Sequence, residues 1–244
     1  MKKLLILIVV LVFGAECIAH DFHNPVSQDI HLKGALSDDA IKYDFSENRD
    51  VPEAFKKTDF KNLTYPVSLR RKPITLKNGK FEYREGIGGN SFELEGVDYA
   101  DINGDTKKEA IVQLFQLSCG GSCDGGSHLF YFYAMKNGRL TLLSRMETGS
   151  LAYGECGLRS FSLRNSRLVL ETFHVCRFDG LHLKPGQDSR PNSEAKVGKF
   201  VANKFTRFRF EFAGRTFKLR RREVLRNADE EIMNYRSKIE ISND

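Results

Sequence analysis

Four segments of the chain each carry two runs of alternating apolar residues on either side of a tight-turn dipeptide. The dipeptides are Asn78-Gly79, Asn137-Gly138, Asn165-Ser166 and Ala213-Gly214. The two Asn-Gly pairs are the stronger signals, because the type I′ turn of a hairpin needs positive φ at both central residues. The 19 Phe and 8 Tyr residues also favour strands. We therefore expect an all-β fold, an antiparallel meander of hairpins that forms a sandwich or a partial barrel.

These hairpins fall within residues 61–226, which we expect to form the β domain. Residues 20–60 lack clear alternation and are expected to be an irregular N-terminal extension packed loosely on the sheet. Residues 181–201 combine prolines with polar residues, which favours a long loop. Residues 227–244 are expected to form a short C-terminal helix and tail, because Asn227 is a suitable N-cap and the apolar residues that follow it lie on one helical face.

The N-terminus has the features of an export signal. Lys2 and Lys3 precede a short apolar run, which ends near the small residues that signal peptidase prefers. We expect a signal peptide over residues 1–19 and a periplasmic or secreted protein with no transmembrane segment in the mature chain. The alternative is a lipid anchor on Cys17, which Glu16 disfavours, since the residue before a lipidated cysteine is normally small.

Four cysteines stay in the exported chain, and in an oxidising compartment such cysteines are usually paired. Cys156 and Cys176 flank the hairpin whose turn is Asn165-Ser166, so their pairing is favoured. Cys119 and Cys123 would then close the CGGSC loop. A zinc site on the Cys-x3-Cys spacing is the alternative.

An acidic segment, VDYADINGDTKKEAIVQL, offers candidate metal ligands. Asp101, Asn103, Asp105 and Glu109 stand at offsets 1, 3, 5 and 9, and the Lys107 carbonyl could fill a further position. Calcium prefers six to eight oxygen ligands of this kind, and alternate positions of a tight loop converge. The second interpretation is a turn held by Asx hydrogen bonds alone. Both interpretations stay open at the level of the sequence.

The stretch DINGDTKKEAIV resembles the calcium loop of FG-GAP repeats, the blades of integrin-type propellers. Because the loop occurs once, no propeller is expected, and Thr106 stands where the repeat usually has glycine. A wider resemblance, from about Phe60 to Leu225, is to uncharacterised bacterial exported proteins that carry one such loop. The stretches that match include LTYPV, CGGSCDGG, LFYFYAMKNG, METGSLAYGECGL and FTRFRFEFAGRTF. The resemblance implies a β domain at the cell envelope and brings no catalytic residues.

The last hairpin is basic. Its alternation places five basic side chains on the outer face, with Phe208, Phe210, Phe212, Phe217 and Leu219 turned inward. The five candidates for anion binding are Arg207, Arg209, Lys218, Arg220 and Arg222. An ordinary solvated face is the alternative. With a net charge of +6, the chain suits an anionic envelope component such as lipopolysaccharide, an anionic lipid or an acidic glycan, or another exported protein. Nucleic acid is not expected.

No catalytic motif stands out in the sequence. It has no HExxH pair and no Gly-x-Ser-x-Gly elbow. We therefore predict a non-enzymatic binding or structural protein of the cell envelope, with calcium as the candidate cofactor. The alternative is a hydrolase of glycans or peptidoglycan with its site near residues 119–127. Two carboxylates converging in a cleft would favour the hydrolase, and a flat basic face would favour the binding protein.

Overall fold

The computed structural model describes residues 51–226, except 69, 86–87, 121–124, 151–155, 165, 179–180, 182, 185–186, 188 and 195–203, together with residues 238–241. The predicted signal peptide with Cys17 lies outside these residues, as do most of the N-terminal extension and the first part of the predicted C-terminal helix.

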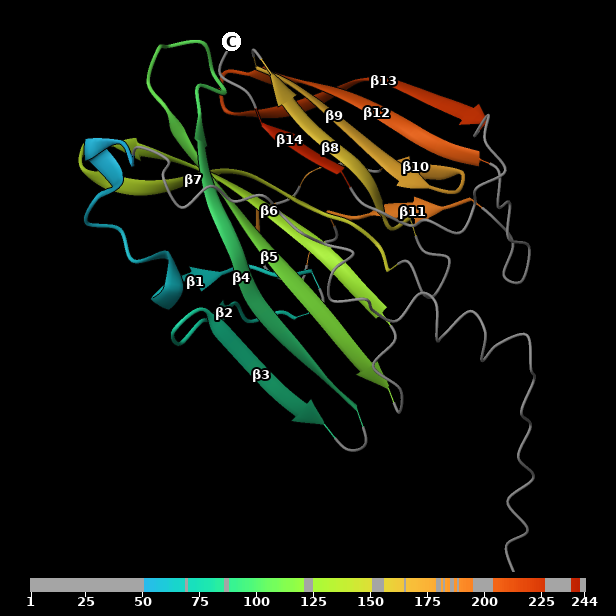
Figure 1. Cartoon of the computed structure of the whole chain (residues 1–244), viewed down its shortest axis with the longest axis horizontal. Helices are drawn as coiled ribbons and strands as arrows, with labels where there is room; N and C mark the ends of the chain where they lie inside the picture. Colours follow the sequence, from blue (N-terminus) through green and yellow to red (C-terminus); the bar gives the residue numbers. More distant parts are fainter. Residues whose placement is uncertain are drawn as a thin grey trace, which may run out of the picture.

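A 5-stranded antiparallel meander, with strand order β3-β4-β5-β6-β7, forms the first sheet (Figure 1). Its strands are β3 (Lys80–Glu85), β4 (Gly88–Ala100), β5 (Glu109–Gly120), β6 (Gly125–Lys136) and β7 (Arg139–Glu147). Every neighbouring pair is antiparallel. The predicted meander is therefore confirmed for this half of the domain.

The second sheet is also 5-stranded, with strand order β13-β12-β9-β8-β14. Its strands are β8 (Leu158–Arg164), β9 (Arg167–Phe173), β12 (Lys204–Ala213), β13 (Thr216–Arg226) and β14 (Lys238–Ile241). Two short antiparallel pairs complete the described strands: β1 (Thr64–Tyr65) with β2 (Ile74–Thr75), and β10 (Cys176–Phe178) with β11 (Pro191–Ser193).

Strand β14 corrects the end of the predicted C-terminal helix, whose residues 227–237 lie outside the described part of the chain. Lys238–Ile241 pair in parallel with β8, where Ile239 lies opposite Phe161. The segment alternates polar and apolar residues, a period of two that suits an edge strand. In this position it satisfies the backbone groups along the outer edge of β8, a tertiary gain that outweighs local helix propensity.

The two sheets pack face to face around one hydrophobic core. Phe130 and Phe132 of the first sheet meet Phe161 of the second, and the rings of Phe130 and Phe161 stack with centroids 4.1 Å apart. Phe208 and Phe210 of β12 belong to the same core. Alternate residues of strands in both sheets therefore point into one interior, as in a sandwich.

A second core covers the opposite face of the first sheet. The segment that precedes β3, with the 3-10 helices η2 (Glu53–Phe55) and η3 (Phe60–Asn62), lies over this face. Phe55 and Phe60 are buried, and the Phe55 ring lies 5.5 Å from that of Tyr99. The Tyr65 and Tyr131 rings are 5.0 Å apart. The described part of the N-terminal extension is thus packed closely, not loosely as predicted.

Both Asn-Gly turns form, but one of them does not join the expected strands. The turn predicted at Ala213-Gly214 lies one residue later, at Gly214-Arg215, because Ala213 still pairs with Thr216. Asn165 of the remaining predicted turn lies outside the described residues. Asn137 and Gly138 have φ values of 50° and 72° and connect β6 to β7. Asn78 and Gly79 also have positive φ, yet their hairpin closes only through the Lys77–Lys80 bridge. Ile74–Thr75 pairs instead with Thr64–Tyr65, and β3 pairs with β4. The all-β prediction is confirmed, and the described residues contain no helix long and apolar enough to cross a membrane.

Candidate functional site

The outer face of the second sheet carries the basic hairpin. In β12, Phe208 and Phe210 are buried in the core. Arg207 and Arg209, which alternate with them along the strand, therefore point away from the core. The same alternation places Arg167 and Glu171 of β9 on this side, opposite Glu211 and Arg207. This surface, together with the outward residues of β8 and β13, is called the outer basic face below.

A β-bulge changes which residues of β13 reach this face. Arg209 lies opposite Arg221, whereas Phe210 lies opposite Leu219, so Arg220 is the extra residue. Beyond the bulge the alternation reverses, and Arg221 joins the outer basic face with 68% of its side chain exposed. The bulge thereby brings two consecutive arginines to one surface.

The same bulge overturns the prediction for Arg222. This residue lies opposite Phe208 and turns to the inner side, where it donates to the Cys176 carbonyl at 2.6 Å and to Glu194 at 2.7 Å. It therefore anchors β10 and is not part of the outer basic face. Leu219, which alternation predicts to be turned inward, is 40% exposed, because β13 is the last described strand on its side of the sheet.

Each carboxylate of the outer basic face pairs with arginine. Glu171 contacts Arg159 and Arg207. Burial alone would raise the pKa of Glu171, but its hydrogen bonds to Arg207 and Ser160 and the charge of Arg159 hold that pKa below its ordinary value. Arg159 also lies over the Phe205 ring, with its guanidinium carbon 4.0 Å from the ring centroid.

The other two carboxylates are shared in the same way. Glu223 accepts from Arg209 at 3.0 Å and pairs with Arg221, also at 3.0 Å. The hydrogen bond from Arg209 lowers the pKa of Glu223. Glu211 pairs with Arg220 at 2.9 Å.

Positive charge exceeds negative charge on this face by a wide margin. Among the residues whose side chains the structure describes, seven basic residues surround three carboxylates on this face, namely Arg159, Arg167, Arg207, Arg209, Lys218, Arg220 and Arg221 around Glu171, Glu211 and Glu223. The ion pairs hold several guanidinium groups in fixed positions, and the face still carries surplus positive charge. It is therefore suited to a polymer with repeated anionic groups. Four of the five predicted anion-binding residues lie on it.

The acidic loop between β4 and β5 is held by Asx hydrogen bonds. Asp101 Oδ1 accepts from the amides of Asn103 and Gly104, at 3.2 and 2.7 Å, and its Oδ2 accepts from Thr106 at 2.8 Å. Asp105 Oδ1 accepts from the Lys107 amide at 2.9 Å. The turn interpretation of this segment thus has its full set of hydrogen bonds.

Glu109 closes the loop from the first residue of β5. Its carboxylate accepts from the Ile102 amide at 3.0 Å and from Asn103 Nδ2 at 2.7 Å. Burial raises the pKa of Glu109 to about 7, and the charges of Asp105 and Asp101 add to the rise. Three carboxylates therefore crowd one small loop.

The fit of this loop to calcium is incomplete. Asn103 directs its amide nitrogen at Glu109, and its oxygen already accepts from the Asp105 amide at 2.8 Å. Within the part of the chain that the structure describes, no group of three or more His, Cys, Asp or Glu side chains could hold a metal ion. Thr106 has a φ of 68°, so the position where the FG-GAP pattern has glycine does require a left-handed conformation.

One of the two predicted disulfides is present. Cys156 and Cys176 are bonded, with their Cα atoms 6.0 Å apart, and the bond joins the start of the β8–β9 hairpin to β10. The Cys119–Cys123 pair lies outside the residues whose side chains the structure describes.

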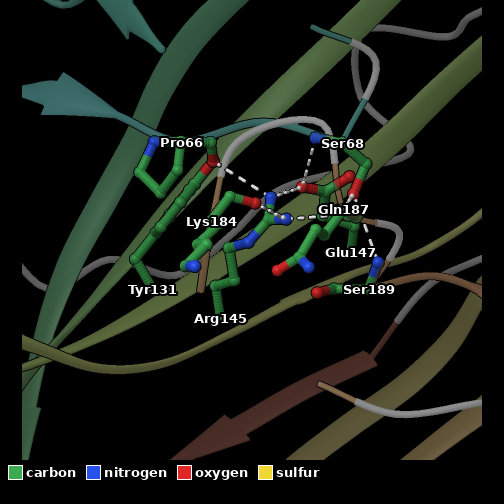
Figure 2. A network of polar contacts seen from close by, with 8 residues as sticks. All are labelled: Pro66, Ser68, Tyr131, Arg145, Glu147, Lys184, Gln187 and Ser189. Atoms are coloured by element: carbon green, nitrogen blue, oxygen red, sulfur yellow. Dashed lines mark hydrogen bonds and ion pairs between the residues drawn. The ribbon is translucent and has the colours of Figure 1, made fainter. Parts of the chain in front are cut away.

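A buried ion pair, absent from our sequence-based candidates, fastens the long loop to the first sheet (Figure 2). Arg145 of β7 is fully buried and donates to Glu147 at 2.6 Å, to the Lys184 carbonyl at 2.9 Å and to the carbonyls of Pro66 and Gln187. Burial raises the pKa of Glu147, and the charge of Arg145 counteracts part of that rise. The network joins three segments that are distant in sequence.

Ser68 completes this network from the opposite side. Its amide donates to Glu147 at 3.0 Å, and its hydroxyl donates to the Gln187 carbonyl at 2.9 Å. The sequence offered one signal for such a pair: Arg145 and Glu147 are charged residues of opposite sign, two positions apart, at the end of the apolar segment RLTLLSRME.

A second polar cluster lies on the inner face of the first sheet. His128 Nδ1 is 3.4 Å from Glu95, and Gln113 donates to Asp98 at 3.2 Å. All four side chains are largely buried. The hydrolase alternative, with its site near residues 119–127, stays a prediction, because residues 121–124 lie outside the described part of the chain.

Comparison with known proteins adds no relative: no family model matches the chain, and no curated protein or solved structure matches it. The resemblance of the acidic loop to FG-GAP repeats therefore stays a prediction.

Proposed function

We propose that the protein is an exported, non-enzymatic binding protein of the cell envelope whose outer basic face engages an anionic partner. The observation that carries the proposal is the excess, among the described side chains of that face, of seven basic residues over three carboxylates. An excess of one sign on one surface raises the local concentration of oppositely charged ligands. The bulge at Arg220 contributes directly, since it turns both Arg220 and Arg221 outward.

Export is supported by two separate features. The first residues of the sequence have the form of a signal peptide. The bond between Cys156 and Cys176 is of a kind that persists in oxidising compartments. The anionic partner would accordingly be an envelope component outside the cytoplasm.

Retention on an anionic matrix tests this proposal with matched charge changes. Arg209→Gln with Arg221→Gln removes two charges from the outer basic face. Lys136→Gln with Arg139→Gln removes two exposed charges at the β6–β7 turn of the other sheet. We expect only the first double variant to elute from immobilised heparin at a clearly lower salt concentration, because screening acts on the site that makes the contacts.

The result that would overturn the proposal is equal elution of the two double variants. Equal loss would mean that net charge alone causes retention, and no loss would mean that the face makes no contact. Thermal unfolding of both variants checks that each remains folded.

We further propose, as a second function, that the acidic loop binds calcium. The observation in favour is the crowding of Asp101, Asp105 and Glu109, since a divalent cation would offset the repulsion that adds to the raised pKa of Glu109. As they stand, these side chains do not form a metal site. Calcium binding would therefore require the loop to exchange its Asx hydrogen bonds for ligation by Asp101, Asp105, Glu109 and the Lys107 carbonyl, with Asn103 turned to present its oxygen. Thermal unfolding with calcium and with chelator tests this, and equal melting of the protein in both would sink it.

A further inference from the structure

The outward face of the first sheet divides into an apolar part and a polar part. The apolar part is covered by the segment that precedes β3. At the other end of the strands, Tyr83 lies opposite Asn90, and Asn90 lies opposite Ser118, so the three residues form a row across β3, β4 and β5. Gln116 is on the same face, one step closer to the core.

These side chains form a connected hydrogen-bond network. Asn90 Oδ1 accepts from Gln116 at 2.9 Å and from the Ser118 hydroxyl at 2.6 Å, while its Nδ2 donates to the Tyr83 hydroxyl at 3.0 Å. Gln116 also donates to Ser118 at 3.0 Å. The network fixes the Asn90 side chain in place, and it leaves the Tyr83 hydroxyl hydrogen and the second Asn90 N–H directed to other acceptors.

Arg70 lies over the aromatic end of this network. Its guanidinium carbon is 4.4 Å from the centre of the Tyr83 ring and 5.4 Å from that of Phe81. Among the residues that the structure describes, Arg70 makes no hydrogen bond and no ion pair. A guanidinium stacked on a ring keeps its N–H groups pointing outward in its own plane, the geometry that binds a carboxylate through two parallel hydrogen bonds.

The local charge favours the same kind of ligand. Arg71 and Lys72 follow Arg70 in the sequence and are exposed. The side chains of the network are neutral, so nothing in it compensates the charge of Arg70. An anionic group would therefore meet a positive field and a fork of donors that are already positioned.

We propose that this surface, the Arg70 patch, binds an acidic sugar; its members are Arg70, Phe81, Tyr83, Asn90, Gln116 and Ser118. The carboxylate of the sugar pairs with Arg70, and its hydroxyl oxygens accept from Asn90 and Tyr83. Asn90 is half-buried, and together with the Tyr83 hydroxyl it offers hydrogen bonds to a hydroxyl-rich ligand from a rigid surface. Gln116 is buried and holds Asn90 in place from beneath. The patch lies on the first sheet, and the proposal does not depend on the outer basic face.

Isothermal titration with oligomers of galacturonic acid tests the patch. We expect saturable binding of the acidic oligomer, at least about tenfold weaker binding after Arg70→Gln, and weaker binding also after Arg70→Lys, which retains the charge but loses the fork. Arg84→Gln is the matched control, since Arg84 is exposed and follows Tyr83 in β3, so its side chain points to the other side of the sheet. We expect this control to bind as the wild type does.

Two comparisons make the test specific. A neutral maltose oligomer should bind at least about tenfold more weakly than the acidic one. The effect of Arg70→Gln should persist in the protein that carries Arg209→Gln and Arg221→Gln, which separates the patch from the outer basic face. No binding of the acidic oligomer, or equal binding by Arg70→Gln, would overturn the proposal. Equally tight binding of succinate would overturn the assignment to a sugar.

Discussion

Replacement of Glu109 by Gln should change how the stability of the protein depends on pH. Glu109 is buried, and its pKa is raised to about 7 by that burial and by the charges of Asp105 and Asp101. Between the ordinary pKa of 4.5 and this value, the folded state binds more protons than the unfolded state. The free energy of unfolding therefore falls as pH rises through this window, and the fall is complete above about pH 8.

The magnitude follows from the size of the shift. One unit of pKa corresponds to about 1.36 kcal/mol, so the rise to about 7 implies a loss of about 3 kcal/mol between pH 4 and pH 8. The amide that Glu109→Gln introduces carries no charge at either pH and avoids this loss. The variant does lose one hydrogen bond, because the new amide nitrogen would face the nitrogen of Asn103, at a cost of about 1 kcal/mol. This second effect does not change with pH.

Urea unfolding of both proteins at pH 4 and pH 8 measures the effect. We expect the stability of Glu109→Gln relative to the wild type to improve by about 3 kcal/mol between the two pH values. Asp105→Asn should give a smaller improvement, since it removes one of the charges that raise the pKa of Glu109. Parallel pH profiles for Glu109→Gln and the wild type would refute the reasoning.

Calcium gives this experiment a second arm. At pH 8, above the pKa of about 7 for Glu109, a ligand that binds only the folded state at a hundred times its Kd stabilises it by about 2.7 kcal/mol. If the loop binds calcium, the wild type should gain more from it than Glu109→Gln does. An equal rise in the free energy of unfolding of the two proteins would mean that calcium binds at a site other than this loop.

Three further predictions concern stability, and urea unfolding checks each of them. Arg145→Met should destabilise the protein by about 3–5 kcal/mol because it leaves the Glu147 carboxylate buried without its partner; a loss under about 1 kcal/mol would contradict this. Replacing Cys156 and Cys176 by Ser should cost about 3 kcal/mol, given their sequence separation of 20, and unchanged stability under oxidising conditions would argue against the bond. Thr106→Asn should stabilise the loop by about 0.5–1 kcal/mol, because Asn tolerates the φ of 68° better than a β-branched residue does; lower stability would show that the Thr106 side chain matters more than its backbone.

Local chemistry was sufficient to predict both Asn-Gly turns and the hairpin around one of them. Asn137 and Gly138 carry their conformational requirement in their own residue types, and the hairpin they join forms as expected. The partner of Ile74–Thr75 could not be found in this way. That segment does not pair with β3 across the Asn78-Gly79 turn. It pairs with Thr64–Tyr65, because the segment before β3 packs against the first sheet.

The C-terminal strand also shows that local sequence cannot identify a pairing partner. Both a helix with Ile232, Tyr235 and Ile239 on one face and a strand with alternating isoleucines can be drawn from the sequence. The available edge of β8 decides in favour of the strand for Lys238–Ile241. Nothing within the segment itself describes that edge, so local periodicity could not choose between them.

The candidate site was predictable in its location and wrong in its register. A strict period of two assigned Arg220 and Arg222 to one face. Three consecutive arginines cannot all lie outward in a regular strand, and the run from Arg220 to Arg222 was the available signal for an irregularity. The bulge keeps Arg220 and Arg221 outward. It turns Arg222 to the inner side, where its guanidinium donates to the Cys176 carbonyl of β10.

The arrangement of the two sheets is consistent with the proposal that the second sheet carries the anion-binding face. Both faces of the first sheet are packed over most of their length, by the second sheet and by the segment before β3. Among the described residues no segment covers the outer face of the second sheet, and the side chains of Arg209 and Arg221 on that face are 46% and 68% exposed, so these two residues are not required for the core. Exposed ion pairs such as Arg209 with Glu223 contribute little to stability. It follows that Arg209→Gln with Arg221→Gln should weaken anion binding while leaving the melting temperature close to that of the wild type. A large drop in melting temperature would instead mean that these arginines serve the fold.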